Sequence, residues 1–294
     1  MKLDDDRWNA LLETRATAPE AVAEAWAARD RRSLLGEGGN LFLLAADHPA
    51  RAAISVGGDP LAMADRRDLL ERLLTALAVP GVDGLLGSPD VLEELLLLGA
   101  LEDRVVVGTM NRGGLAGAVW EMDDRMTAYD TAALVGTGIE GGKMLLRIDP
   151  DDPGSLPTIE ICARAVGELA EAGLMAMIEP LPYTTDDSGR ARLDDDPDAL
   201  IRAIGVASAL GPTSAHTWLK LPATGDVERV MGATTLPSLI LGGAPGPDPA
   251  TAFAAWERAL AVPQVRGLVV GRTLLYPPDG DVEAAVTTAA GIVR

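Results

Sequence analysis

Cysteine, histidine and lysine are all scarce in this 294-residue chain, and each scarcity excludes something. The single cysteine, Cys162, rules out an intrachain disulfide and is compatible with a reducing compartment. Two histidines are too few for a typical histidine-rich metal site, and no His/Asp/Glu cluster has metal-ligand spacing. The sequence therefore predicts neither a metal ion nor another cofactor.

Positive charge is scarce as well, because 25 basic residues face 44 acidic ones and the net charge is −19. With this charge we expect the protein to bind neither nucleic acids nor anionic membranes. No apolar run approaches the ~18 residues that a membrane-spanning helix needs, and the acidic start of the chain does not resemble a signal peptide. We expect a cytoplasmic protein in which a few local cations hold any anionic ligand.

Only three lysines occur, Lys2, Lys143 and Lys220, whereas arginine supplies the other 22 basic residues. Both internal lysines lie in apolar, strand-like segments, where a charged amine is costly unless it is paired or deprotonated. Unlike arginine, lysine can lose its proton, attack a carbonyl carbon and form a Schiff base. We predict that Lys220, within Thr217-Trp218-Leu219-Lys220-Leu221-Pro222, does this.

Apolar strands alternate regularly with helical patterns from residue 41 onward. The expected strands cover residues 41–46, 82–86, 104–108, 143–148, 174–178, 217–222, 238–241 and 267–270. Eight such units in about 250 residues favour an α/β fold of the (β/α)₈ TIM-barrel type. The alternative is an open Rossmann-like sheet, but Gly-x-Gly-x-x-Gly is absent after the first strand. We assign residues 1–38 to an N-terminal helical extension, broken near Pro19, and residues 39–294 to one catalytic barrel domain.

In such a barrel the active site lies at the C-terminal ends of the strands, and polar residues cluster there in this sequence. Alternation of side chains along a strand places Lys143 and Arg147 on one face, and Glu179 lies on the strand between those of Lys143 and Lys220. Burial and neighbouring positive charge lower the pKa of a lysine, and a carboxylate beside it can move protons. The predicted catalytic residues are Lys220, Glu179, Lys143 and Asp47.

Glycines end the last two strands and predict an anion site, because exposed backbone N–H groups in these loops bind phosphate in many barrels. The predicted substrate- and phosphate-binding residues are Arg147, Arg112, Gly242, Gly243, Gly271 and Arg272.

Plainer interpretations stay open for these residues. Lys220 and Lys143 can instead be structural lysines paired with Asp47 or Glu179, and the glycines can be ordinary loop residues. His48 is expected to cap or pack a loop. The long segment after the 104–108 strand, up to Arg125, is expected to form a lid or a subunit contact in a homo-oligomer.

Several short motifs resemble, in order along the chain, the class I aldolase superfamily, which includes deoxyribose-phosphate, tagatose-bisphosphate and archaeal-type fructose-bisphosphate aldolases. The motifs are Ala45-Ala46-Asp47-His48-Pro49-Ala50-Arg51, Lys143-Met144-Leu145-Leu146, Glu179, Leu219-Lys220-Leu221-Pro222, Gly242-Gly243 and Gly271-Arg272. The resemblance implies that Lys220 is the Schiff-base lysine, assisted by Lys143 and Glu179. It also implies that Asp47 matches the aspartate ending the first strand, and that Gly243 and Arg272 bind phosphate.

The expected function is a metal-independent class I aldolase that cleaves a phosphorylated keto-sugar, or a keto-deoxy sugar acid phosphate, reversibly at a carbon–carbon bond. The first alternative is a non-catalytic barrel that binds a sugar phosphate. The second is a sugar-phosphate isomerase or epimerase with Glu179 as its base. The scarcity of lysine favours the aldolase.

Overall fold

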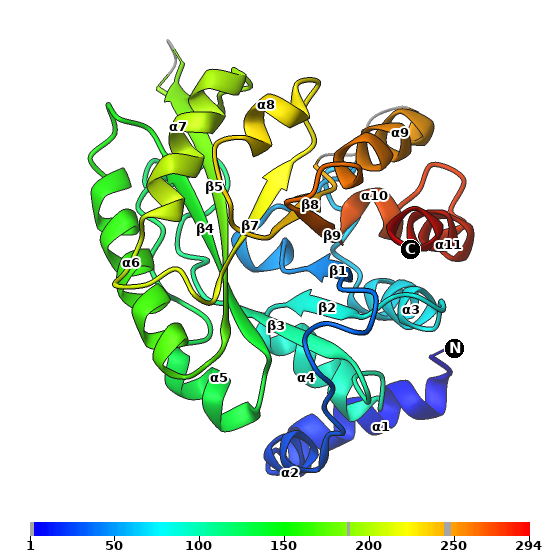
Figure 1. Ribbon diagram of the computed structural model, residues 1–294. Helices are drawn as coiled ribbons and strands as arrows, with labels where there is room; N and C mark the ends of the chain where they lie inside the picture. Colours follow the sequence, from blue (N-terminus) through cyan, green and yellow to red (C-terminus); the bar gives the residue numbers. More distant parts are fainter. Residues whose placement is uncertain (1–2, 187–188, 244–247) are drawn as a thin grey trace.

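The computed structural model describes residues 3–186, 189–243 and 248–294. Eight parallel strands close into a barrel surrounded by helices, as the sequence predicts (Figure 1). Each strand pairs in parallel with its neighbours, and pairing of β4 with β5 closes the sheet. The barrel strands are β1 (Leu41–Ala46), β2 (Gly84–Gly87), β3 (Val105–Thr109), β4 (Gly141–Ile148), β5 (Met175–Thr185), β7 (Thr217–Pro222), β8 (Ser238–Leu241) and β9 (Val265–Val270).

Helices follow the strands and are started mainly by aspartate. Asp65, Asp130, Asp196, Asp248 and Asp281 each accept a hydrogen bond from a backbone N–H of the first helical turn. Part of the large negative charge therefore serves to cap helices. The helices are α3 (Arg66–Leu77), α4 (Pro89–Leu97), α5 (Thr131–Thr137), α6 (Ser155–Glu171), α7 (Pro197–Ser208), α8 (Val227–Met231), α9 (Pro249–Leu260), α10 (Arg272–Leu275) and α11 (Val282–Val293), with a short 3₁₀ helix η1 (Pro49–Arg51) after β1.

The strands are apolar on both faces because each face is covered. On β1, Leu41 and Leu43 point into the barrel, whereas Phe42 and Leu44 pack against the outer helices. The interior is filled at the N-terminal end by residues such as Met177. This apolar layer closes the bottom of the barrel interior, and the polar residues lie above it, at the C-terminal ends of the strands.

The N-terminal helices α1 (Asp5–Thr17) and α2 (Ala21–Ala28) pack beside α4 (Figure 1). Arg29, buried just after α2, donates to the carbonyl oxygens of Arg104 and Gly138 and pairs with Glu140 at 2.8 Å. These contacts tie the segment to the start of β3 and β4. In the described residues, no helix is long and apolar enough to cross a membrane.

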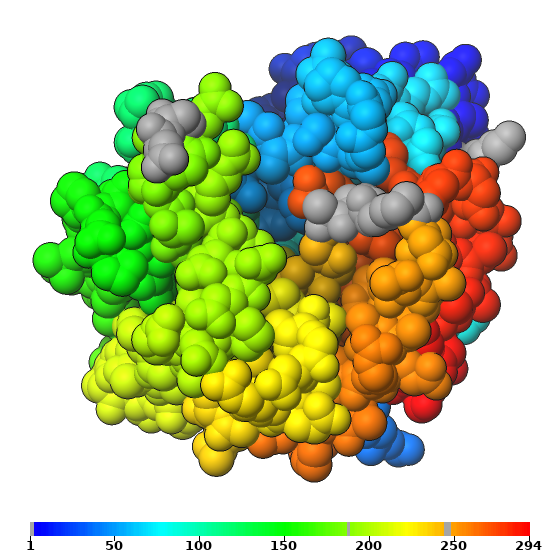
Figure 2. All heavy atoms as spheres, turned by 90° about the horizontal axis from the view of Figure 1, so that it is seen from above, coloured from blue at the N-terminus to red at the C-terminus, as the bar shows by residue number. Residues whose placement is uncertain are grey.

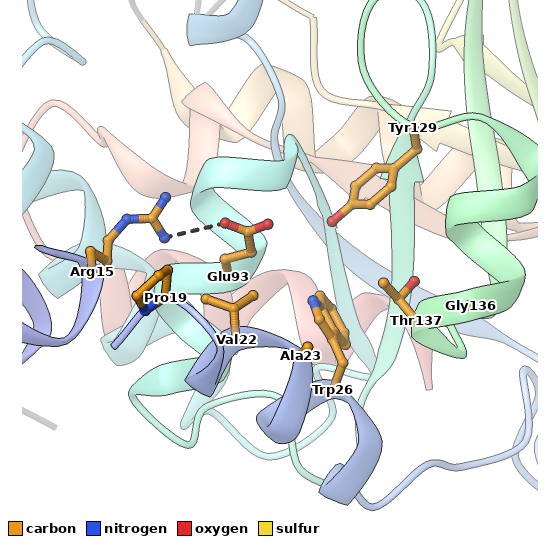
Figure 3. A pocket seen from close by; sticks show the side chains of 9 residues that line it. All are labelled: Arg15, Pro19, Val22, Ala23, Trp26, Glu93, Tyr129, Gly136 and Thr137. Carbon is orange, nitrogen blue, oxygen red and sulfur yellow. Dashed lines mark hydrogen bonds and ion pairs between the residues drawn. The ribbon is translucent and has the colours of Figure 1, made fainter. Parts of the chain in front are cut away.

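A cavity of about 480 Å³ remains between these two helices and the barrel helices (Figure 3). Arg15 and Glu93 form an ion pair of 3.3 Å at this cavity, and Trp26 and Tyr129 are its aromatic lining. None of the predicted site residues lines it.

The structure adds one feature that the sequence analysis missed. Strand β5 continues past the predicted end at residue 178 to Thr185 and forms an antiparallel hairpin with β6 (Ala191–Leu193). Two prolines, Pro180 and Pro182, mimic a strand end in the sequence. They are tolerated because β7 pairs with β5 only up to Ile178. Beyond this residue β5 still pairs with β4, but the edge of β5 that faces away from β4 has no partner strand in the barrel.

Candidate active site

A cavity of about 270 Å³ opens at the C-terminal ends of the barrel strands. Figure 2 views the molecule from above, where the segment after β1 (blue) and the β5–β6 hairpin (yellow-green) come close together. All the predicted site residues except Arg147 line this cavity. Its lining consists of Ala45, Asp47, His48, Arg51, Arg112, Lys143, Leu145, Glu179, Leu181, Tyr183, Leu193, Lys220, Pro222, Leu241, Gly242, Gly243, Val269, Gly271 and Arg272.

Glu179 lies between the two internal lysines. The register of β4, β5 and β7 sets it beside Leu145 on one side and one residue beyond the Ile178–Leu219 pair on the other. Its Oε2 atom is 3.3 Å from Lys220 Nζ and forms a closer ion pair with Lys143 Nζ. All three side chains are nearly fully buried, so the carboxylate is shared by two amines away from solvent.

Burial and charge shift the pKa values of this group in the directions that amine chemistry requires. Burial lowers the pKa of Lys220; the negative charge of Glu179 opposes this shift, and the positive charges of Arg112 and Arg51 add to it. Burial, followed by the charge of Arg112, also lowers the pKa of Lys143 well below its usual value. Burial alone would raise the pKa of Glu179, but Lys143 and Lys220 together hold it well below its usual range. The glutamate is therefore a carboxylate at neutral pH, beside two amines that give up their protons easily.

Asp47 forms the other wall of the lysine site. Its Oδ2 atom is 3.4 Å from Lys143 Nζ and accepts a hydrogen bond from the Arg112 guanidinium. Arg112 also donates from Nε to Thr109 Oγ1 at 2.7 Å, and burial lowers its pKa to about 10. Arg112 lines the cavity as expected, but its guanidinium holds Asp47 and places a fixed positive charge near Lys143.

Arg147 does not line the cavity. Its side chain is fully buried and pairs with Glu121 at 2.7 Å and Asp124 at 3.0 Å, and it donates to the Gly114 carbonyl at 3.0 Å. All these partners belong to the irregular segment after β3. The predicted substrate contact of Arg147 is therefore not found: its guanidinium is buried outside the cavity, where two carboxylates of this loop neutralise its charge.

The segment after β3 is anchored at several points. Asn111 exchanges hydrogen bonds with the backbone of Leu145, donating at 2.6 Å and accepting at 2.7 Å, as a neighbouring strand would. Asp124 accepts a hydrogen bond of 2.9 Å from the Gly114 N–H and is fully buried. In this structure the segment forms a fixed wall beside the barrel mouth.

Glycines shape the side of the cavity next to β8 and β9. A side chain at Gly271 would place its Cβ atom 2.4 Å from the Ala45 carbonyl oxygen, so only glycine fits there. Gly243 has a φ of +67°, which favours glycine. Arg272 donates to the Ser55 carbonyl at 3.3 Å, and its Nε is buried with no hydrogen-bond partner in the described residues. The loop continues through residues 244–247, outside the described part of the chain.

Three polar residues line the cavity without having been predicted as site residues: His48, Arg51 and Tyr183. His48, which was expected to cap or pack a loop, stands at the N-cap of η1 and also lines the cavity. Its Nδ1 atom is 3.9 Å from Asp47 Oδ1, and its pKa is held low by burial and by Arg272. Arg51 enters from η1, and Tyr183 from the hairpin. His48 and Arg51 were marked by their position directly after a strand and within the first aldolase-like motif, whereas no such signal marked Tyr183. In the described residues, no group of three or more His, Cys, Asp or Glu side chains could hold a metal ion.

Comparison with known proteins gives one family and one fold. A family model described as Cgl0159-like matches residues 39–290. The crystal structure of Cgl0159 from Corynebacterium glutamicum is 51% identical, with 99% of this chain and 97% of that chain covered and a TM-score of 0.96. No curated protein matches the sequence.

Two further structures share the barrel at low identity. An archaeal fructose 1,6-bisphosphate aldolase is 18% identical, with 92% of this chain and 98% of that chain covered and a TM-score of 0.66. A fructose-1,6-bisphosphate aldolase described as Schiff-base forming is also 18% identical, with 93% and 100% covered and a TM-score of 0.67. At this identity the likeness concerns the fold.

Proposed function

The chain belongs to the Cgl0159-like family, and from its site we propose that it is a class I aldolase. It forms a Schiff base between Lys220 and the ketone of a phosphorylated keto-sugar and cleaves a carbon–carbon bond reversibly. The observation that carries this proposal is the buried Lys220–Glu179–Lys143 cluster at the C-terminal end of the barrel. A lysine with a lowered pKa beside a shared carboxylate is the arrangement that imine formation needs.

The first half of the reaction builds the imine. The neutral Lys220 amine attacks the substrate ketone, and the resulting carbinolamine loses its hydroxyl group as water. That water needs a proton, and Lys143, which is ion-paired with Glu179, is placed to pass one on. The product is a protonated imine on Lys220, which draws electrons from the neighbouring carbon–carbon bond.

The second half breaks the bond. Glu179 accepts the proton of the substrate hydroxyl two carbons from the imine, and that oxygen forms the carbonyl of the departing aldehyde. The electron pair of the broken carbon–carbon bond moves toward the imine nitrogen and leaves an enamine on Lys220. Protonation of the enamine carbon and addition of water then release the ketone and restore the amine. The sum is one substrate converted to one ketone and one aldehyde, with no oxidant or reductant.

Arg272, Gly271 and Gly243 supply the anchor in this proposal. The Arg272 guanidinium has an unused buried donor, and backbone N–H groups in glycine loops make concave anion sites. A phosphate held beside β8 and β9 places the ketone one strand away, over Lys220 on β7. The low-identity aldolase structures support the proposal through their shared fold, and one of them is described as Schiff-base forming.

Borohydride trapping tests the function. The protein is incubated with dihydroxyacetone phosphate and sodium borohydride, and its intact mass is measured. One reduced adduct is expected for the natural sequence, the same adduct at a lower rate for Lys143→Met, and none for Lys220→Met. A non-catalytic sugar-phosphate site or an isomerase without a covalent step would give no adduct with any of the three.

A further inference from the structure

The two sides of the candidate active site differ in chemical character. At the start of α10 and the end of η1 the lining carries Arg272 and Arg51, whereas the opposite wall belongs to β4, β5 and β6. The charged groups of that wall lie at its base, where Lys143 pairs with Glu179. Toward the mouth it is lined by Leu145, Leu181, Tyr183 and Leu193.

The arginine side has unused capacity for an anion. Within the described residues, Arg272 makes one hydrogen bond, to the Ser55 carbonyl. Arg51 contacts Glu121 at 3.5 Å, while Glu121 lies closer to Arg147. Burial, followed by the charge of Arg51, lowers the pKa of Arg272, so the two guanidinium groups lie near enough to repel each other. A phosphate between them relieves this repulsion and takes up their free donors.

The hydrophobic wall offers nothing equivalent. Arg147 is the nearest cation above Lys143 on β4, and it lies behind Tyr183, 5.9 Å from that ring, with its charge matched by Glu121 and Asp124. In the described lining of this wall, the leucines and the tyrosine carry no positive charge. Arg51 lies near enough to Tyr183 for its charge to act on the hydroxyl group, but the phosphate beside Arg272 takes up its donors. A second phosphate on this wall would therefore lose water without gaining a charged partner of its own, which is strongly unfavourable.

We propose that the substrate carries a single phosphate, on the half that joins Lys220, and that its aldehyde half is short and carries no phosphate. This inference rests on the proposed aldolase function. The arginines beside β9 hold the phosphate, and the aldehyde half lies against Leu145, Leu181, Tyr183 and Leu193. The cavity volume of about 270 Å³ suits a sugar of this size.

Two ketoses that differ by one phosphate test the proposal. Fructose 1-phosphate and fructose 1,6-bisphosphate are titrated into the protein by calorimetry. Fructose 1-phosphate is expected to bind at least tenfold more tightly. Leu193→Arg adds a cation to the hydrophobic wall at a position that is 51% exposed, and it is expected to reduce this preference at least threefold by improving bisphosphate binding. Leu12→Arg is the matched control, 49% exposed on α1, and is expected to behave as the natural sequence.

Equal or tighter binding of the bisphosphate by the natural sequence would overturn the proposal, as would an unchanged preference in Leu193→Arg. Trapping both sugars with borohydride separates this inference from the function beneath it. A tenfold binding preference without any adduct on Lys220 supports the single-phosphate site and refutes the aldolase. An adduct together with preferred bisphosphate binding supports the aldolase and refutes the single-phosphate substrate.

Discussion

Replacing Glu179 by glutamine removes the charge that two buried lysines share. Lys143 and Lys220 both contact the Oε2 atom of Glu179, and Lys143 has one more carboxylate nearby, Asp47 at 3.4 Å. The amide keeps the shape of the side chain but neither neutralises the lysines nor accepts a proton. Glu179→Gln therefore separates proton transfer from the packing of the site.

The expected loss has two parts. Proton transfer by a positioned side chain contributes about 10²–10⁴-fold to a rate, and we expect kcat for carbon–carbon cleavage to fall within this range. Removing one partner of a buried ion pair typically costs about 3–5 kcal/mol of stability. The cost here should lie at the lower end, because both lysines have lowered pKa values and can become neutral.

The pH dependence of stability gives a second readout. Because Glu179 has a folded-state pKa below its unfolded value of about 4.3, its ion pairs stabilise the fold above that pH. This contribution is lost as the pH falls through the folded pKa. The stability difference between the natural protein and Glu179→Gln should therefore shrink in acid, which urea denaturation at several pH values measures.

Glu140→Gln is the matched control for this variant. Glu140 is also buried and paired with two cations, Arg29 and Arg31, but these contacts tie the N-terminal segment to the start of β3 and β4. We expect Glu140→Gln to lose stability and keep kcat. If Glu179→Gln keeps kcat within threefold of the natural protein, or if both variants lose kcat equally, the proton-transfer role of Glu179 is refuted.

Three further predictions follow from the same geometry. The rate of imine trapping on Lys220 should rise with pH to a plateau, because the neutral amine is the nucleophile. The midpoint of this rise should lie below the ordinary lysine pKa of about 10.4, and borohydride trapping quenched at fixed times across a pH series measures it. Arg272→Ala should weaken binding of dihydroxyacetone phosphate by about 10–150-fold, equivalent to the ~1.5–3 kcal/mol of a charged hydrogen bond, in calorimetry. Arg147→Met should cost about 3–5 kcal/mol in urea denaturation, because Glu121 and Asp124 lose their partner.

The barrel and its lysine site were predictable because both depend on local regularities. Side chains alternate along a strand, so Lys143 and Glu179 had to point inward if Leu145 and Met177 did. Strands of a (β/α)₈ barrel follow one another in chain order, which placed Glu179 between the two lysines. Spacing and strand order together were enough to bring these residues into one site.

The features that the sequence did not reveal depend on irregular backbone. Arg147 shares the inward alternation of Lys143, but its partners Glu121 and Asp124 come from a loop whose path no periodic pattern describes. The β5–β6 hairpin was hidden by prolines that usually end a strand. Arg51 reaches the cavity only through the turn of η1. Tertiary contacts, more than local propensity, decide the position of each.

The most direct test of the central claim is a crystal structure of the protein soaked with dihydroxyacetone phosphate. We predict continuous electron density between Lys220 Nζ and the ketone carbon, with the phosphate beside Arg272 and Gly271. A ligand that occupies the cavity without a covalent bond, or one that is bonded to Lys143, would contradict it.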